Sequence, residues 1–308
     1  MNRFDIVGHR KIWYIFSSTI IIAGLICMFT KGFNLGIDFT GGTLLNLEFE
    51  EPVDINDVRT IMNDYVAGNT QIQMAGAQND SVTAQNVMIR TRDLSQQERE
   101  NVLQGFKEKL GDYKILREEK VGATIGSELI MKAVWAALIS WLLIIIYISY
   151  RFEFKFGLAA VLALVHDTLV VLSVFSLTQK EIDSSFIAAI LTVVGYSVTD
   201  TIVIFDRIRE NLKLHFKRGG DIEALANRSI YQTLTRSIYT VTTILVTTIA
   251  LYIFGGDTTR DFAFALMVGF AFGSYSSIFT ATPLWVTFRE YSERRQAKKR
   301  MKPRVAKQ

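Results

Sequence analysis

The sequence has little cysteine, proline and histidine, and each shortage excludes a class of protein. The single cysteine, Cys27, cannot form an intrachain disulfide, which excludes a scaffold held together by such bridges. Three prolines in 308 residues exclude a collagen-like chain. The three histidines, His9, His166 and His215, are far apart and match no zinc-binding spacing, so we expect no metal site.

Signatures of nucleotide-driven and hydrolytic enzymes are also missing from the sequence. It contains no Walker A pattern, no HExxH and no GxSxG. We therefore expect a protein that is not an enzyme and needs no cofactor. Any energy that it uses must come from an ion gradient or from a partner.

What the sequence does contain is apolar and charged at once. Apolar residues make up 49% and charged residues 21%, and the mean hydropathy is +0.23. Twenty-one phenylalanines do not fit a disordered chain. A uniform soluble globule does not combine these values, so the apolar and charged residues must be segregated along the chain.

The apolar residues gather in six segments, each long enough to cross the ~30 Å hydrocarbon core of a bilayer. They are 12–30, 129–150, 156–177, 184–205, 236–254 and 262–288. The first is longer than the ~7–15 apolar residues of a signal peptide, and no small-residue cleavage site follows it promptly. We predict a polytopic α-helical membrane protein with six transmembrane helices.

Lysine and arginine are concentrated on one side of these spans. They occupy residues 1–11, the connection between spans two and three, the loop 206–235 and the tail 289–308. The opposite short loops hold only Lys180 and Arg260. The positive-inside rule therefore predicts that both termini are cytoplasmic. Contact with anionic lipid explains this basic excess more simply than nucleic acid does.

Residues 31–128 form a polar stretch between spans one and two, which this topology places outside the cytoplasm. It holds ten Lys/Arg against sixteen Asp/Glu. Alternating and helical patterns predict the order β-α-β-β-α-β, a ferredoxin-like α+β domain. The predicted strands are 43–50, 70–74, 87–91 and 113–121, with a turn at 78–80; the predicted helices are 55–66, capped by Asp54, and 95–110, opened by the capping box of Ser95 and Glu98.

Ionisable side chains inside three spans are the candidates for function, because such groups are costly in a bilayer. His166 and Asp167 lie near the middle of span three, and Asp200 lies in span four. Arg236 stands where span five begins. Static alternatives remain for each: Asp200 and Arg236 as an ion pair that joins two helices, and His166 as a hydrogen-bond donor to a neighbouring helix.

Two polar faces accompany these residues. On span four, helical spacing places Tyr196, Ser197 and Thr201 on the face of Asp200. On span five, Arg236 heads a stripe of Thr240, Thr243 and Thr247, and Gln232 lies one turn before it. Such faces on neighbouring spans are suited to meet around water. A carboxylate there can take up and release protons as the helices move.

Five segments resemble the SecD/SecF family, across essentially all of residues 4–290. They are LGIDFTGG at 35–42, ALVHD at 163–167, VGYSVTDTIVIFDRIREN at 194–211, NRSI at 227–230 with Gln232 and Arg236, and the N-terminal pairs Phe4-Asp5 and Arg10-Lys11. Two positions depart from the family pattern, Thr199 and Tyr231, where asparagine is usual. Neither departure removes an ionisable group.

The resemblance implies half of a resistance-nodulation-division transporter in the bacterial inner membrane. A chain of this kind would pair with SecD, associate with the SecYEG channel and YajC, and use the proton gradient to draw unfolded polypeptide across the membrane. It carries the family's proton-pathway positions onto Asp200 and Arg236. The full predicted set is Asp200, Arg236, Asp167 and His166, supported by Tyr196, Ser197, Thr201, Gln232 and Thr240.

The glycine-rich motif after span one has its own interpretation. Gly36, Gly41 and Gly42 indicate unusual backbone geometry, as a hinge or as a plain tight turn that Asp38 caps. Two other functions compete with energy coupling. A passive scaffold for membrane partners would tolerate loss of Asp200, whereas a small-molecule exporter of the same superfamily would need a second half.

Overall fold

The computed structural model describes residues 4–66, 70–75, 83–215 and 220–301, which fall into two compact units. The membrane unit comprises 1–34, 135–180 and 185–308. The inserted domain comprises Leu35–Val134 together with the short segment Glu181–Ser184. Below, the terminus-side end of a span is the end nearer the chain termini, and the domain-side end is the opposite one.

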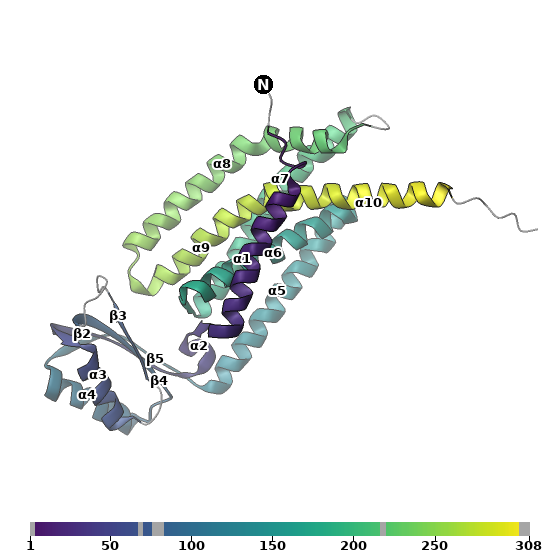
Figure 1. The fold of residues 1–308 in the computed structure, drawn as a ribbon. Coiled ribbons are helices and arrows are strands. Elements are labelled where there is room, and N and C mark those ends of the chain that lie inside the picture. Colours follow the sequence, from purple (N-terminus) through teal and green to yellow (C-terminus); the bar gives the residue numbers. More distant parts are fainter. Residues whose placement is uncertain (1–3, 67–69, 76–82, 216–219, 302–308) are drawn as a thin grey trace, which may run out of the picture. The chain divides into compact units, whose positions relative to one another are not determined.

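Six stretches of the described residues are long and apolar enough to cross a membrane, which confirms the predicted class. The spans are α1 (Arg10–Lys31), α5 (Ala123–Arg151), α6 (Phe154–Thr178), α7 (Ser184–His215), α8 (Ile222–Phe254) and a last one built from α9 (Asp257–Ser276), the π-helical η1 (Ser277–Ala281) and α10 (Thr282–Met301) (Figure 1).

Several helices continue beyond the predicted spans. The fifth span was predicted over 236–254, but α8 begins at Ile222, where the side chain of Asp221 accepts hydrogen bonds from the backbone N–H groups of Glu223 and Ala224. Hydropathy detects only the part of a helix that matches a bilayer. The segment 222–235 contains good helix formers such as alanine, leucine, glutamine and glutamate, so the helix extends beyond the apolar stretch.

The third, fourth and sixth spans form the interior of the membrane unit. More than two fifths of the apolar window is buried in each of them, against 17% or less in α1, α5 and α8. At the terminus-side end of this core, the ring of Trp285 stacks on Phe156 at a centroid distance of 4.7 Å, and Phe205 meets Phe156 edge-on. Because α6, α7 and the last span are the most buried helices of the unit, many of their polar side chains are buried inside the protein.

The inserted domain has the predicted ferredoxin-like topology. Its elements are β2 (Gly42–Asp54), α3 (Ile55–Tyr65), β3 (Gln71–Ala75), β4 (Thr83–Thr91), α4 (Gln96–Leu110) and β5 (Tyr113–Val121). The antiparallel sheet has the order β3-β4-β2-β5, so the second and third strands of the domain lie on one side of the first and the fourth lies on the other. The predicted turn at 78–80 lies outside the described residues.

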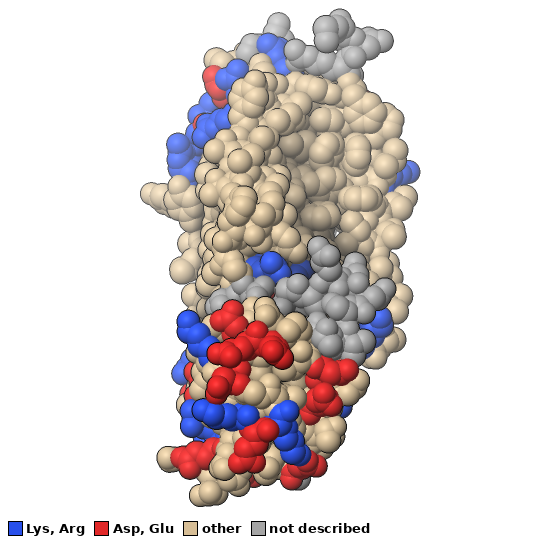
Figure 2. All heavy atoms as spheres, turned by 90° about the vertical axis from the view of Figure 1, so that its left-hand side faces the viewer, with Lys and Arg blue, Asp and Glu red and all other residues tan. Residues whose placement is uncertain are grey.

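Local signals in the sequence explain these elements. Asp54 accepts a hydrogen bond from the backbone N–H of Asn56, and Ser95 and Glu98 form the reciprocal capping box at the start of α4. Both helices bury one apolar face against the sheet, where Phe106 meets Phe49 edge-on. On the face shown in Figure 2, acidic and basic side chains crowd the inserted domain, whereas the middle of the spans is largely uncharged.

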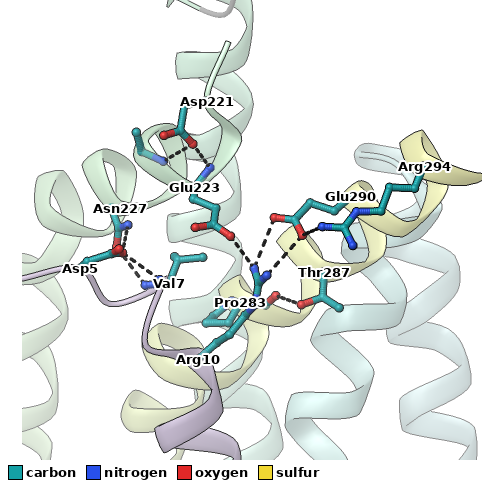
Figure 3. A network of polar contacts seen from close by, with 12 residues as sticks. Asp5, Val7, Arg10, Asp221, Glu223, Asn227, Pro283, Thr287, Glu290 and Arg294 are labelled. Atoms are coloured by element: carbon teal, nitrogen blue, oxygen red, sulfur yellow. Dashed lines mark hydrogen bonds and ion pairs between the residues drawn. The ribbon is translucent and has the colours of Figure 1, made fainter. Parts of the chain in front are cut away.

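A polar network ties three helices together at the terminus-side end (Figure 3). The guanidinium of Arg10, on α1, lies 2.9 Å from Glu223 of α8 and 3.2 Å from Glu290 of α10. Beside it, Asn227 donates to Asp5 at 2.6 Å and accepts from the backbone N–H of Val7 at 3.1 Å. The N-terminal motif and the motif at the start of α8 are thus two halves of one structural contact.

Candidate functional site

The carboxylate of Asp167 lies in the interior of the membrane unit and is fully buried. Its Oδ2 accepts hydrogen bonds from the hydroxyls of Ser197 on α7, at 2.6 Å, and of Ser276 on α9, at 2.9 Å. Its Oδ1 lies 3.0 Å from Nδ1 of His166. Three helices therefore meet at this one side chain.

The second buried carboxylate, Asp200, belongs to α7 and is 8% exposed. The hydroxyl of Ser237 on α8 donates to its Oδ1 at 2.6 Å. Its Oδ2 is buried and has no hydrogen-bond partner among the described residues. Asp200 thus has one oxygen held by a neighbouring helix and one oxygen unpaired.

Two further hydroxyl groups lie where α7 meets the last span, beside the residues that carry or bind the two carboxylates. Thr201 and Ser277 exchange a hydrogen bond of 2.8 Å, and Ser277 also donates to the carbonyl of Gly273 at 3.0 Å. Ser277 opens the π-helical segment η1, directly after Ser276, which binds Asp167. Two consecutive serines of the last span therefore form hydrogen bonds with α6 and α7: Ser276 with Asp167, and Ser277 with Thr201.

Sequence reasoning missed two of these side chains. Ser237 and Ser276 are ordinary small residues in apolar helices. The available signal was the serine-rich run 274–277 within the last span. Nothing in the sequence predicts a role for Ser237, because it is a single uncharged residue that follows the charged Arg236.

Arg236 does not pair with Asp200 in the structure. Its side chain is exposed, and within the described residues no ion pair joins the two groups. Instead it lines an open cavity of about 630 Å³ at the terminus-side end of α5, α7 and α8. Arg151, Asp206 and Arg207 also line this cavity. A static ion pair between Asp200 and Arg236 is therefore not what this structure contains.

The other supporting residues make no hydrogen bond to Asp200 among the described residues. Gln232 accepts hydrogen bonds from Arg207 at 2.7 Å and from Asn211 at 2.8 Å, at the same cavity. Thr240 is exposed and donates to the carbonyl of Arg236 in its own helix. Tyr196 packs edge-on against Phe270 of α9. The predicted threonine stripe is exposed, and Ser237 makes the contact of α8 with Asp200.

The motif at 35–42 folds as a short helix, α2 (Ile37–Thr40), between two tight backbone positions. Gly41 and Gly42 have positive φ angles of +72° and +136°, which confirms the unusual backbone geometry predicted for them. Gly36 has an ordinary φ of −69°. Gly36 instead lies close to Glu181, since a Cβ there would be 2.6 Å from Oε1 of that side chain. Asp38 does not cap its own turn: its Oδ2 accepts from the backbone N–H of Ser184 at 2.8 Å.

This arrangement is suited to taking up a proton. A serine hydroxyl donates to an ionised carboxylate and accepts from a protonated one, so each partner serves both states. The described residues contain no group of three or more His, Cys, Asp or Glu that could hold a metal ion.

Comparison with protein-family models gives two matches. Residues 101–291 match the model described as "Protein export membrane protein SecD/SecF, C-terminal". Residues 28–53 match the model described as "SecD/SecF GG Motif". The first match includes both buried carboxylates, and the second includes Gly36, Asp38, Gly41 and Gly42.

Individual proteins are similar over nearly the whole chain. The protein translocase subunit SecF of Acidaminococcus fermentans is 46% identical, over 96% of this chain and 100% of its own. That of Haemophilus influenzae is 39% identical, over 88% and 82%. The crystal structure of the translocon-associated membrane protein SecDF from Thermus thermophilus superposes with a TM-score of 0.83 at 36% identity, over 94% of this chain and 39% of that longer one.

Proposed function

This chain belongs to the SecD/SecF family of protein export membrane proteins, and from that premise we propose how it contributes to export. It is a multi-pass membrane subunit of the Sec protein-export machinery. We propose that, together with SecD, it couples the proton motive force to late steps of translocation across the bacterial plasma membrane.

The observation that carries this proposal is the pair of buried carboxylates, which are held by hydroxyls and, at Asp167, by the imidazole of His166, and not by a lysine or an arginine. An ionised carboxylate in a low-dielectric interior is costly unless it is paired, and protonation removes that cost. Asp200 offers an unpaired Oδ2 to a proton while Ser237 holds Oδ1. Loading and unloading this group changes the balance of forces between α7 and α8.

We infer a route of transfer from the order of polar groups along α7. Ser197, which binds Asp167, precedes Asp200 by three residues, or about 4.5 Å along the helix. A proton that arrives from the domain-side end would reach Asp167 and His166 first. It would then pass by way of the hydroxyls of Thr201 and Ser277 to Asp200, and leave to the open cavity. The charge of Arg236 at that cavity opposes its return.

The same proposal includes orientation and partners. The positive-inside rule supports cytoplasmic termini, with the inserted domain on the far side, where it would meet emerging unfolded polypeptide. The chain matches only 39% of the SecDF chain, which supports association with a SecD half. SecYEG and YajC are further proposed partners. The exposed apolar faces of α5 and α8 are available to SecD and to lipid.

Export in a strain depleted of the native subunit tests this function. Complementation with Asp200→Asn, which keeps the volume and removes the charge, should abolish proton-dependent export, and Arg236→Met should reduce it strongly. Membrane levels must match the wild type, since altered buried charges also affect folding. Normal proton-dependent export from both variants would overturn the proposal in favour of a passive scaffold. Unchanged export with lost drug efflux would favour an exporter.

A further inference from the structure

The loop between spans three and four is part of the inserted domain, although almost 140 residues separate it from the motif that it contacts. Strand β6 (Glu181–Ile182) pairs with β1 (Asn34–Leu35), and the backbone N–H of Gly36 donates to the carbonyl of Ile182 at 2.8 Å. An ion pair between Glu181 and the buried side chain of Arg90, on β4, fixes the same segment to the sheet.

The loop ends in a helix cap supplied from elsewhere in the chain. Ser184 is the first residue of α7, and its backbone N–H is one of the four that no intrahelical carbonyl can satisfy. The carboxylate of Asp38 accepts this hydrogen bond at 2.8 Å. A negative charge at this position also complements the positive end of the helix dipole.

The geometry of the motif holds this carboxylate in place. Gly36 leaves room for Glu181, because a Cβ there would lie 2.6 Å from the Glu181 carboxylate. On its other side, α2 is packed so closely on α5 that a Cβ at Gly126 would lie 2.5 Å from the carbonyl of Phe39. The helix that carries Asp38 is therefore held between the domain-side end of α5 and the domain-side end of α7, where α7 begins.

We propose that Asp38 is a positioning residue that fastens the outer end of α7 to the inserted domain. Because α7 also carries Asp200, sixteen residues or about 24 Å further along, a shift of this helix is passed to the domain through the Asp38 contact. The inference rests on the proposed proton coupling. It adds a hydrogen bond to the covalent connections that α1 and α5 make with the domain.

A capping role and a proton-carrying role for Asp38 predict opposite results for one substitution. Asparagine caps helices about as well as aspartate, whereas alanine does not. With Asp38→Asn, export in the depleted strain should stay within about twofold of the wild type. With Asp38→Ala it should fall at least fivefold at matched membrane levels. Wild-type export with Asp38→Ala, or equal loss with Asp38→Asn, would overturn the proposal.

The motion of the inserted domain can be measured separately from folding, because a purely structural role for Asp38 does not predict its loss. Spin labels at Lys107→Cys on the inserted domain and Tyr291→Cys on α10, both exposed, can be placed in a Cys27→Ala background and studied with SecD in membranes. The distance distribution of the parent and of Asp38→Asn should change between pH 6 and pH 8, and that of Asp38→Ala should not. A preserved change in Asp38→Ala would overturn the proposal.

A charge exchange covers the case in which Asp38→Ala does not fold. Arg90→Glu and Glu181→Arg should each impair export, and the double exchange should restore at least half of it. Failure of the double variant, at normal expression, would count against the fastening. Asp200→Asn is run in parallel: if it exports normally, the proposed function has failed, whereas loss in Asp200→Asn with full export in Asp38→Ala refutes the fastening alone.

Discussion

The hydroxyl of Ser237 donates to Oδ1 of Asp200 at 2.6 Å, while the guanidinium of Arg236, one residue earlier, lines the open cavity. The buried carboxylate is thus held by a neutral group, and the cation next in sequence lies toward water. In the proposed mechanism this separation matters, because no cation has to leave before the carboxylate of Asp200 is protonated.

Removing the hydroxyl of Ser237 should impair the proposed coupling. A hydrogen bond to a charged group contributes about 1.5–3 kcal/mol, so Ser237→Ala should lower proton-dependent export about tenfold or more. Ser237→Thr keeps the hydroxyl and is the matched control, with export near the wild-type level. Export rates in inverted membrane vesicles, with and without an uncoupler, measure both. Equal activity of the two variants would show that the contact carries no function.

The two hydroxyls at Asp167 should be energetically coupled. Ser197→Ala and Ser276→Ala each remove one donor to Oδ2, and each should cost about 1–3 kcal/mol of stability. The double variant should deviate from additivity by about 0.5 kcal/mol or more, since both groups share one acceptor. Unfolding in detergent measures this. Ser173→Ala is the control, because Ser173 bonds only to the carbonyl of Leu169 in its own helix.

Gly42 should tolerate no side chain. Its φ is +136°, and a Cβ would lie 2.3 Å from the carbonyl oxygen of Thr91. We expect Gly42→Ala to destabilise the inserted domain by more than about 2 kcal/mol, from backbone strain and this clash together. Gly122→Ala is the matched control, since no atom lies within 4 Å of its Cβ position. Hydrogen exchange of β2 amides in the intact protein compares the two.

The capping box of α4 should make the inserted domain sensitive to acid. The hydrogen bond from Arg92, followed by those from Ser95, lowers the pKa of Glu98 from 4.5 to about 2. The folded state therefore holds this group ionised at a pH where the unfolded chain binds a proton. Its contribution to stability is complete above about pH 4.5 and is lost as the pH falls toward 2. Hydrogen exchange of α4 amides over this range should show the loss, and Glu98→Gln should reduce its pH dependence.

The inserted domain was predictable from the sequence almost element by element. Its strands alternate, and its helices begin at Asp54 and at the Ser95–Glu98 box, so local chemistry determines where each element starts. The six spans were predictable for a similar reason, because hydropathy over about twenty residues reports a bilayer crossing. The extension of α8 back to Ile222 was not, since hydropathy is silent outside the membrane.

The site was only half predictable. Asp167 and Asp200 can be identified from the sequence because they are charged residues in apolar spans. Their partners Ser276 and Ser237 cannot, because serine is common in such helices. Helical periodicity groups residues on one face and gives no indication of which neighbour that face meets. This is why Arg236 and Thr240 were expected opposite Asp200, where the packing of α7 and α8 places Ser237.

The π-helical segment η1 sets the rotational phase of the last span. Residues before it reach Asp167 through Ser276, and residues after it bring Trp285 onto Phe156 and Glu290 to Arg10. An α-helix advances by about 100° for each residue. Loss of a single residue within 277–281 would therefore turn all of α10 away from two sets of contacts while leaving the hydropathy of the span unchanged. The length of this segment thus determines the contacts of α10 as strongly as the identity of any side chain in it does.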